Sequence, residues 1–316
     1  MLREYALTPQ VFSAGAFENS TVRRLALAQL VPEFIHGAGV VRNLADGAWE
    51  KAVEATVGQN DVDGSRLLKA LLLRGTIRCH APGPVPGHGE AEWISVAETE
   101  HAARPLRGVI CSPAIQTTDR LVANITHLDR CAWWTEHPSS WSLNRSLDDY
   151  RKFFEPLFTY SRELFFVDQY LDPLEPNYSD FSKLLRFLHQ KNQSCRVSIH
   201  RSIEKQVPGR RPLQPSIDEW SGRFQSLADE SGHSFELVLR RESEAYLNAQ
   251  FRPHDRFLIS NVAILSLTNG FDTQKYAMTT MTLLREEDGA NYRRFYERTY
   301  GLGVRLVTIR PVAPAL

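Results

Sequence analysis

Helical and strand-like runs alternate along the second half of the chain, which is the pattern of an α/β sheet. Apolar residues recur at helical spacing in four stretches, which cover residues 147–161, 179–191, 217–229 and 289–300. Short apolar runs typical of strands cover residues 164–170, 196–202, 235–239, 278–284 and 304–310, with two paired strands around His254 and Ile264. The pattern therefore predicts one α/β domain over residues 147–316, with a mixed sheet flanked by helices.

The first half of the chain has a less regular pattern. Apolar residues at helical spacing predict a helix over residues 21–34, and a second helix over 64–75 ends at a glycine. Residues 76–81 are typical of a strand, residues 82–89 form a loop rich in Pro and Gly, and residues 93–96 could be the returning strand. A helix followed by a long hairpin is compatible with a small winged-helix module.

Two interpretations of this N-terminal module, residues 1–104, stay open. A winged helix would place its second helix in a DNA groove, but that helix carries only Arg66, Lys69 and Arg74 as basic residues. The alternative is a small helical or mixed α/β domain with an ordinary hairpin. Residues 105–146 are irregular and are predicted to connect the two domains.

Composition and charge are those of an ordinary globular protein. The chain has 316 residues, 42% of them hydrophobic, 10% aromatic and 23% charged, which is enough for two domains with packed cores. Its 37 basic residues balance 37 acidic ones, so global charge gives no argument for non-specific binding to nucleic acid. The first residues lack the pattern of a signal peptide, and no apolar run is long enough to span a bilayer. These features predict a cytoplasmic location and no transmembrane segment.

The four cysteines predict neither a metal site nor a disulfide framework. Cys79, Cys111, Cys131 and Cys195 are far apart in sequence, without a Cys-x-x-Cys motif or a neighbouring His cluster. We therefore expect reduced, mostly buried thiols, no bound metal and no cofactor.

The candidate catalytic residues are His254, Arg256 and Asn261. His254 and Arg256 stand two residues apart in a predicted strand, so their side chains point to the same side of the sheet. An imidazole and a guanidinium placed in this way can bind a phosphate. Asn261 follows five residues after Arg256 and precedes a second strand-like run, residues 262–267.

Five further residues are candidate substrate-binding groups. Three of them end predicted strands, where α/β sheets bind their ligands, and two lie in the turn after residues 262–267. They are Asp168, Tyr170, His200, Asn269 and Asp272. A purely structural alternative stays open, in which Arg256 pairs with Asp168 or Asp272 and His254 bonds a backbone carbonyl.

The spacing of His254, Arg256 and Asn261 resembles the His-x-Lys-x4-Asp signature of the phospholipase D superfamily, with Arg in place of Lys and Asn in place of Asp. The order of motifs looks closer still to the phospholipase-D-like domain at the C-terminus of microtubule-interacting-and-transport proteins and to bacterial relatives of that domain. The strand Phe165–Leu171 and the helix Phe181–Leu188 resemble elements of the same domain. The resemblance covers the chain from about Leu147 to its end.

The resemblance implies a site whose chemistry depends on two copies of the motif. In the hydrolytic family a His attacks phosphorus to form a phosphohistidine, and a second copy of the motif protonates the leaving group. This chain has one copy, so hydrolysis would require a symmetric homodimer. Asn261 in place of Asp also removes the carboxylate that would orient the imidazole. The enzymatic activity therefore stays open between metal-independent phosphodiester hydrolysis and binding without turnover.

The resemblance also implies a class of partner. The leading hypothesis is a phospholipase-D-like protein that binds DNA or RNA as part of a multi-protein bacterial system, such as antiphage defence. A second hypothesis is an adaptor that binds a protein or an anionic lipid headgroup without catalysis. The third is a metal-independent nuclease that is active as a homodimer.

Overall fold

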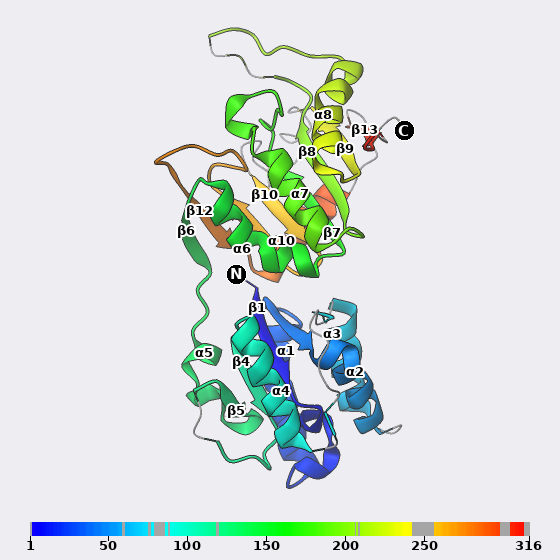
Figure 1. The fold of residues 1–316 in the computed structure, drawn as a ribbon, viewed down its shortest axis with the longest axis vertical. Coiled ribbons are helices and arrows are strands. Elements are labelled where there is room, and N and C mark those ends of the chain that lie inside the picture. The colour runs from blue at the N-terminus through cyan, green and yellow to red at the C-terminus, as the bar shows by residue number, and fades with distance from the viewer. Residues whose placement is uncertain are drawn as a thin grey trace. The chain divides into compact units, whose positions relative to one another are not determined.

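The chain folds into two compact units, Met1–Pro138 and Ser139–Leu316 (Figure 1). The computed structural model describes residues 2–58, 61–74, 77–78, 86–87, 89–117, 120–205, 207, 209–241, 256–297 and 304–312. Both units combine helices with a β-sheet, which confirms the predicted α/β class.

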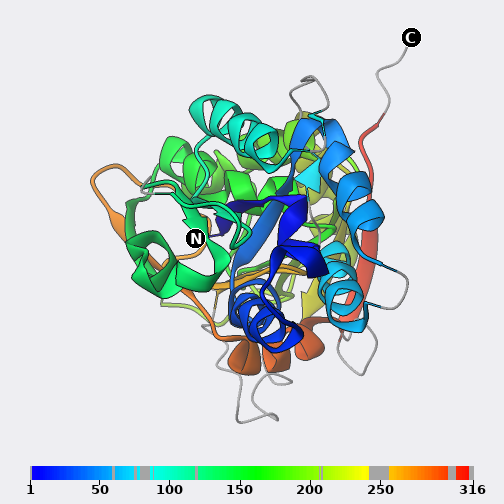
Figure 2. The ribbon, with the colours of Figure 1, turned by 90° about the horizontal axis from the view of Figure 1, so that it is seen from below.

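The first unit contains a parallel five-stranded sheet in the order β3-β2-β1-β4-β5. Its strands are β1 (Arg3–Leu7), β2 (Gly39–Asn43), β3 (Ile77–Arg78), β4 (Gly108–Cys111) and β5 (Val122–Asn124). Its longer helices are α1 (Ser20–Phe34), α2 (Leu44–Thr56), α3 (Val62–Arg74) and α4 (Glu90–Ala103), followed by the short α5 (Ala132–Thr135). Helices α1 and α3 pack together on one face and α2 and α4 on the other (Figure 2). Strands β2 and β4 are buried throughout, as expected for a parallel sheet covered on both faces.

The hairpin expected in the first unit is not formed. Ile77 and Arg78 pair in parallel with β2, and the expected returning strand, residues 93–96, is wrong because it lies within α4. Trp93, Ala97 and Glu100 recur at helical spacing and are buried, so this segment presents a helix face to the core. Most of the loop at residues 82–89 lies outside the described residues.

The segment expected to connect the domains, residues 105–146, contains three strands. Strands β4 and β5 complete the sheet of the first unit, whereas β6 (Ser140–Asn144) is the edge strand of the sheet in the second. The division between the units lies between Pro138 and Ser139. Trp133 and Trp134 pack beside Tyr5 in the core of the first unit, with ring centroids 6.0 and 5.5 Å away.

The second unit is built on a mixed eight-stranded sheet in the order β13-β9-β8-β7-β10-β11-β12-β6. Its remaining strands are β7 (Glu163–Val167), β8 (Arg196–Ser202), β9 (Phe235–Arg240), β10 (Phe257–Ser260), β11 (Ile264–Leu267), β12 (Met278–Leu283) and β13 (Val304–Ile309). Strands β7, β8 and β9 are parallel, and every other pairing is antiparallel. Its helices are α6 (Leu147–Tyr160), α7 (Phe181–Lys191), α8 (Ile217–Ser231) and α10 (Glu286–Glu297). Where they fall on described residues, the helices and strands expected from residue 147 onward are thus confirmed within a few residues at each end, whereas the part of the predicted strand around His254 and residues 298–300 lie outside the described residues.

Alternation along β7 separates the two faces of this sheet. Phe166 contacts the rings of Phe158 in α6 and Phe181 in α7, with centroids 6.2 and 5.3 Å away. Its neighbour Val167 points to the other face, in a cluster with Tyr296 of α10. The residue after Val167 therefore faces α6 and α7, at the carboxyl end of the parallel strands.

Candidate functional site

A cavity of about 380 Å³ opens at the carboxyl ends of β7 and β8 in the second unit. Its wall is formed by Arg201 at the end of β8 and by residues that follow β7, β8 and β11, with Arg145 before α6 and Arg256 before β10. The lining residues are Arg145, Gln169, Tyr170, Asp172, Glu175, Asn177, Tyr178, Arg201, Glu204, Lys205, Arg256, Asn269 and Asp272. Ligands of α/β sheets bind at this end of the parallel strands. We therefore take this cavity as the candidate site.

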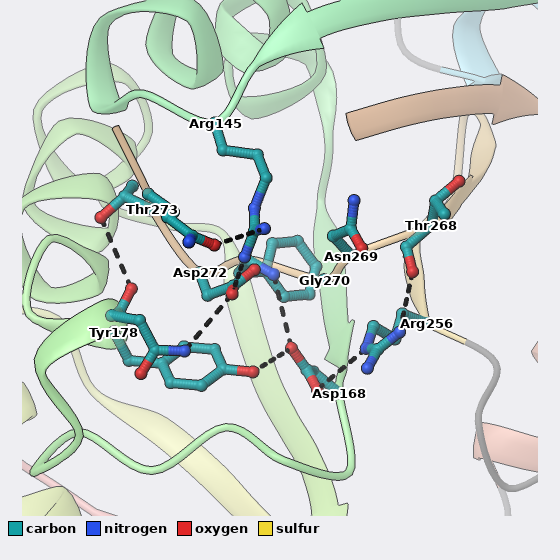
Figure 3. A network of polar contacts seen from close by, with 12 residues as sticks. Arg145, Asp168, Tyr178, Arg256, Thr268, Asn269, Gly270, Asp272 and Thr273 are labelled. Carbon is teal, nitrogen blue, oxygen red and sulfur yellow. Dashed lines mark hydrogen bonds and ion pairs between the residues drawn. The ribbon is translucent and has the colours of Figure 1, made fainter. Parts of the chain in front are cut away.

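The register of two antiparallel strands places Arg256 beside Asp168. Phe257 of β10 pairs with Val167 of β7, so the next residues outward on the two strands face each other. Nε of Arg256 lies 3.6 Å from Oδ1 of Asp168, and Nη1 donates a hydrogen bond of 2.8 Å to the carbonyl of Thr268 (Figure 3). The guanidinium also lies 5.1 Å from the centre of the Tyr170 ring. Three contacts thus fix the Arg256 side chain at the cavity wall.

Asp168 is fully buried and holds Arg256 from behind the cavity wall. Its carboxylate accepts hydrogen bonds from the Tyr178 hydroxyl at 2.9 Å and from the backbone N–H groups of Tyr170 and Phe271 at 3.0 and 3.4 Å (Figure 3). Burial raises the pKa of Asp168 above its ordinary value, and the charge of Arg256 acts in the opposite direction. Burial, and then the charge of Asp168, likewise raises the pKa of Tyr178.

Gly270 lets the turn after β11 pass close to this pair. Its φ is +74°, in the left-handed region that favours glycine. A Cβ at this position would collide with Oδ2 of Asp168 and would lie 2.8 Å from Cδ of Arg256. The glycine of the Asn269-Gly270 pair is therefore required both by the backbone and by the space around Asp168.

Asp272 is the centre of a second polar cluster on the same wall. Its Oδ2 accepts hydrogen bonds from Arg145 and from Nδ2 of Asn177, the latter at 3.3 Å, and its backbone carbonyl accepts one of 3.0 Å from the Tyr150 hydroxyl. Its Oδ1 is buried and has no hydrogen-bond partner among the described residues. Nη1 of Arg145 also donates to the side-chain carbonyl of Gln274 at 2.9 Å.

The loops after β7 and β8 are held by buried charge. The Arg201 guanidinium stacks on the Trp220 ring, 3.4 Å from its centre, and donates to the carbonyls of Leu171, Ser202 and Glu204 at 2.5–3.2 Å. Burial lowers the pKa of Arg201 to about 9. Asp172 pairs with Lys205 at 3.0 Å and with Arg223 at 2.7 Å. Burial alone would raise the pKa of Asp172, but the two cations and a hydrogen bond of 3.1 Å from the N–H of Leu174 outweigh it, and the pKa is lowered.

Four of the predicted binding residues meet at the cavity, and so does Arg256. Asp168 lies directly behind its wall, whereas Tyr170, Asn269 and Asp272 line it. Nδ2 of Asn269 donates a hydrogen bond of 3.0 Å to the Met278 carbonyl. His254 lies outside the described residues, so its place relative to Arg256 stays a prediction.

His200 and Asn261 lie elsewhere. His200 is paired in register with Val167, so it faces α10, where the rings of Phe165 and Tyr296 lie 5.4 Å from it on two sides. Burial lowers the pKa of His200 well below its ordinary value. Asn261 follows the far end of β10, and its side-chain oxygen accepts a hydrogen bond of 2.7 Å from the N–H of Arg162. Neither residue lines the cavity with Arg256. Strand alternation puts His200 on the opposite face of the sheet, and the length of β10 puts Asn261 at the opposite end of that strand.

Arg145 and Tyr178 complete the site but were not singled out from the sequence. Arg145 directly precedes Ser146, the residue that caps α6, and Tyr178 lies in a short 3-10 helix after β7. Neither position belongs to a periodic pattern, so no local signal marks it. Arg145 contacts Asp272, which is distant in the sequence. Tyr178 contacts Asp168, from which a loop separates it.

The charges that line the cavity are balanced. Its lining contains four basic and four acidic residues, and these are Arg145, Arg201, Lys205, Arg256, Asp172, Glu175, Glu204 and Asp272. Across the described ranges, no group of three or more His, Cys, Asp or Glu side chains is arranged to hold a metal ion. In the same part of the chain, no helix has the length and apolar character needed to span a membrane.

The corresponding end of the first sheet is closed by a side chain of the chain itself. Between the ends of β1 and β4, the Glu90 carboxylate accepts hydrogen bonds from the Thr8 hydroxyl at 2.5 Å and from the Ser112 hydroxyl and N–H at 2.6 and 2.7 Å. The Glu90 carboxylate is therefore already hydrogen-bonded to the polar groups that a ligand would bind at this end of the first sheet.

Comparisons with known proteins show no family for this chain. No protein-family model matches it, and no curated protein does. One similar solved structure is that of TrmBL2, an archaeal chromatin protein with a novel mode of DNA binding. The match has 9% sequence identity and covers 78% of this chain and 84% of that chain, with a TM-score of 0.25. A TM-score this low does not show a shared fold.

Proposed function

We propose that the second unit is a phospholipase-D-like domain that binds a phosphodiester group of DNA or RNA at this cavity and does not hydrolyse it. The observation that carries the proposal is the position of Arg256, a guanidinium fixed at the cavity wall by the fully buried Asp168. A guanidinium keeps its charge at every physiological pH and presents planar donors that match phosphate oxygens.

Arg256 keeps a donor available for a ligand. Its Nε faces Asp168, its Nη1 is bound to Thr268, and Nη2 has no hydrogen-bond partner among the described residues. The Arg256 side chain is 20% exposed and lines the cavity. Tyr170 and Asn269 lie on the same wall and can contact the sugar or base next to a bound phosphate.

Binding without hydrolysis is favoured by the residues around Arg256. In the phospholipase D superfamily, which this chain resembles, the phosphohistidine mechanism uses two histidines at one phosphate. Within the described part of the chain, His200 faces the other side of the sheet, and Asn261 is bound to Arg162 at the far end of β10. No histidine is among the described residues that line the cavity, so His254 is the candidate from the motif, and a complete site would need a second copy.

Binding of labelled oligonucleotides tests the proposal. The full chain should bind single-stranded DNA or RNA at about 50 mM salt, with an affinity that falls as salt rises because phosphate contacts release counterions. Arg256→Ala should weaken binding at least about tenfold, the loss of one charge-assisted contact. Arg196→Ala is the matched control, because Arg196 is 82% exposed on β8 and does not line the cavity. No binding at low salt, or equal binding by Arg256→Ala, would overturn the proposal.

Two further measurements separate the alternatives. Cleavage of an oligonucleotide in EDTA that is lost in His254→Ala would show a metal-independent nuclease, and a dimer in solution would then be required. Flotation with anionic vesicles that depends on Arg256, together with no oligonucleotide binding, would show a lipid adaptor. A part in a multi-protein bacterial system is a proposal of the same kind, which co-purification of partners from a bacterial host would test.

A further inference from the structure

An exposed tyrosine occupies a strained turn next to the candidate site. The N–H of Ala277 donates a hydrogen bond of 3.3 Å to the carbonyl of Gln274, which closes a four-residue turn with Tyr276 in its third position. The φ of Tyr276 is +60°, a left-handed conformation that turns usually give to Gly or Asn. A tyrosine there has a conformational cost, because its Cβ crowds the neighbouring carbonyl.

No side-chain contact of Tyr276 within the described residues compensates for this cost. The Tyr276 side chain is fully exposed, and it forms no ring contact or side-chain hydrogen bond in that part of the chain. Met278, two residues later, is also exposed. Strained backbone conformations cluster at functional positions, and the side chain of Tyr276 gains nothing from the fold in return. Tyr276 is therefore better explained by a contact outside the chain than by folding.

Backbone hydrogen bonds attach this turn to the cavity wall. The N–H of Gln274 donates to the Arg145 carbonyl at 2.9 Å, and the N–H of Arg145 donates to the Ala277 carbonyl at 2.8 Å. The Arg145 side chain, which lines the cavity, contacts both Gln274 and Asp272. Lys275, the residue before Tyr276, is exposed and adds a positive charge to the same turn. An aromatic surface and basic groups are thus held next to each other.

We infer that Tyr276 stacks on an unpaired base of a single-stranded nucleic acid whose backbone is bound at Arg256. This inference rests on the proposed function and adds to it the strandedness of the ligand. Proteins that bind single strands combine basic grooves with aromatic side chains on which bases stack. Bases of a duplex are stacked within the helix, so an exposed ring on a turn that is hydrogen-bonded to the cavity-lining Arg145 favours single strands.

Substitutions at Tyr276 separate stacking from folding. Tyr276→Gly relieves the left-handed strain, so its thermal midpoint should equal or exceed that of the wild type, while its affinity for a single-stranded oligonucleotide falls about five- to hundredfold. Tyr276→Trp keeps an aromatic face and should bind within a few fold of the wild type. Tyr276→Asn, which also tolerates this φ, serves as a second variant should Tyr276→Gly fold poorly. Leu25→Ala, at an exposed apolar residue of the first unit, should change neither property.

The outcomes distinguish this inference from the proposed function. Should Arg256→Ala lose binding while Tyr276→Gly and Tyr276→Asn bind as the wild type does, the stacking role is wrong and the phosphate site stands. An equal loss for single-stranded and duplex oligonucleotides in the Tyr276 variants would overturn the preference for single strands. A wild-type chain that binds no oligonucleotide at low salt overturns both ideas together.

Discussion

Oδ1 of the fully buried Asp168 lies 3.6 Å from Nε of Arg256, whose side chain is 20% exposed. The two residues extend from adjacent antiparallel strands, β7 and β10, at one end of the sheet. Burial destabilises the carboxylate, so it depends on the hydrogen bonds and the cation around it. Changes to these partners should therefore affect the stability of the unit and the position of Arg256 together.

The Tyr178 hydroxyl should contribute more to stability than an ordinary buried hydroxyl. It donates a hydrogen bond of 2.9 Å to the Asp168 carboxylate, and bonds to charged acceptors are stronger than bonds to carbonyls. We expect Tyr178→Phe to lower the free energy of unfolding by about 1.5–3 kcal/mol, measured by urea denaturation. Tyr150→Phe is the matched control, because that hydroxyl donates to the Asp272 carbonyl at 3.0 Å and should cost about 0.5–1.5 kcal/mol. Equal costs would show that the Asp168 charge has little effect.

Gly270→Ala should damage both the fold and the site. The substitution adds the cost of a left-handed φ to a collision with Asp168 and Arg256, so we expect a loss of about 2–4 kcal/mol in the free energy of unfolding. Gly222→Ala in α8 is the control, because its Cβ would meet no atom within 4 Å and helical Ala is more stable than Gly by about 1 kcal/mol. Thermal unfolding of the two variants should thus shift in opposite directions, and a neutral Gly270→Ala would contradict the described packing.

The second unit could be predicted from sequence because its elements carry strong periodic signals. Helices α6 and α7 each bury one apolar face, and the strand β7 between them is followed by a polar segment. The first unit differs in this respect. Its strands β2 and β4 are short and buried throughout, so they lack the alternation that marks a strand, and they were missed. Helix α4 buries few residues, and its Trp93 to Val96 run suggested a strand instead.

The sequence predicted those site residues that lie at the ends of strands. Asp168 and Arg256 meet because β7 and β10 pair, and the alternation of side chains puts both on one face. The same alternation moves His200 to the face of α10, one residue from Arg201, so an error of one position in the register changes the chemistry of the site. Arg145 and Tyr178 reach the site through loop geometry, which no periodic pattern encodes.

Arg201 should not be replaceable by lysine. Its guanidinium donates to three backbone carbonyls and stacks on Trp220, whereas a lysine ammonium cannot reach all three in that plane. We expect Arg201→Lys to cost about 3 kcal/mol or more, measured by urea denaturation. Arg223→Lys is the control, because Arg223 lies beside the same Trp220 ring but farther from its centre, at 5.0 Å, and a lysine can keep its ion pair with Asp172. That control should lose less than about 1 kcal/mol, and similar losses in both variants would argue against the geometric role of Arg201.

His200 should make the second unit less stable in acid. Burial, and then the charge of Arg240, lowers its pKa well below the ordinary value near 6.5, and neither ring nitrogen has a hydrogen-bond partner among the described residues. The unfolded chain therefore binds a proton below about pH 6.5 that the folded chain does not, so stability is present above that pH and is lost as the pH falls. The slope is about 1.4 kcal/mol per pH unit until the folded pKa is reached.

His200→Phe should remove this part of the acid sensitivity. A phenyl ring can occupy the space between Phe165 and Tyr296 without titrating, so the difference in unfolding free energy between pH 8 and pH 5 should shrink by about 2 kcal/mol. It should not vanish, because burial also lowers the pKa of His233. Leu25→Ala, at an exposed position of the first unit, should leave the difference unchanged. Urea denaturation at both pH values measures the effect, and an unchanged difference in His200→Phe would mean that His200 takes up a proton without unfolding.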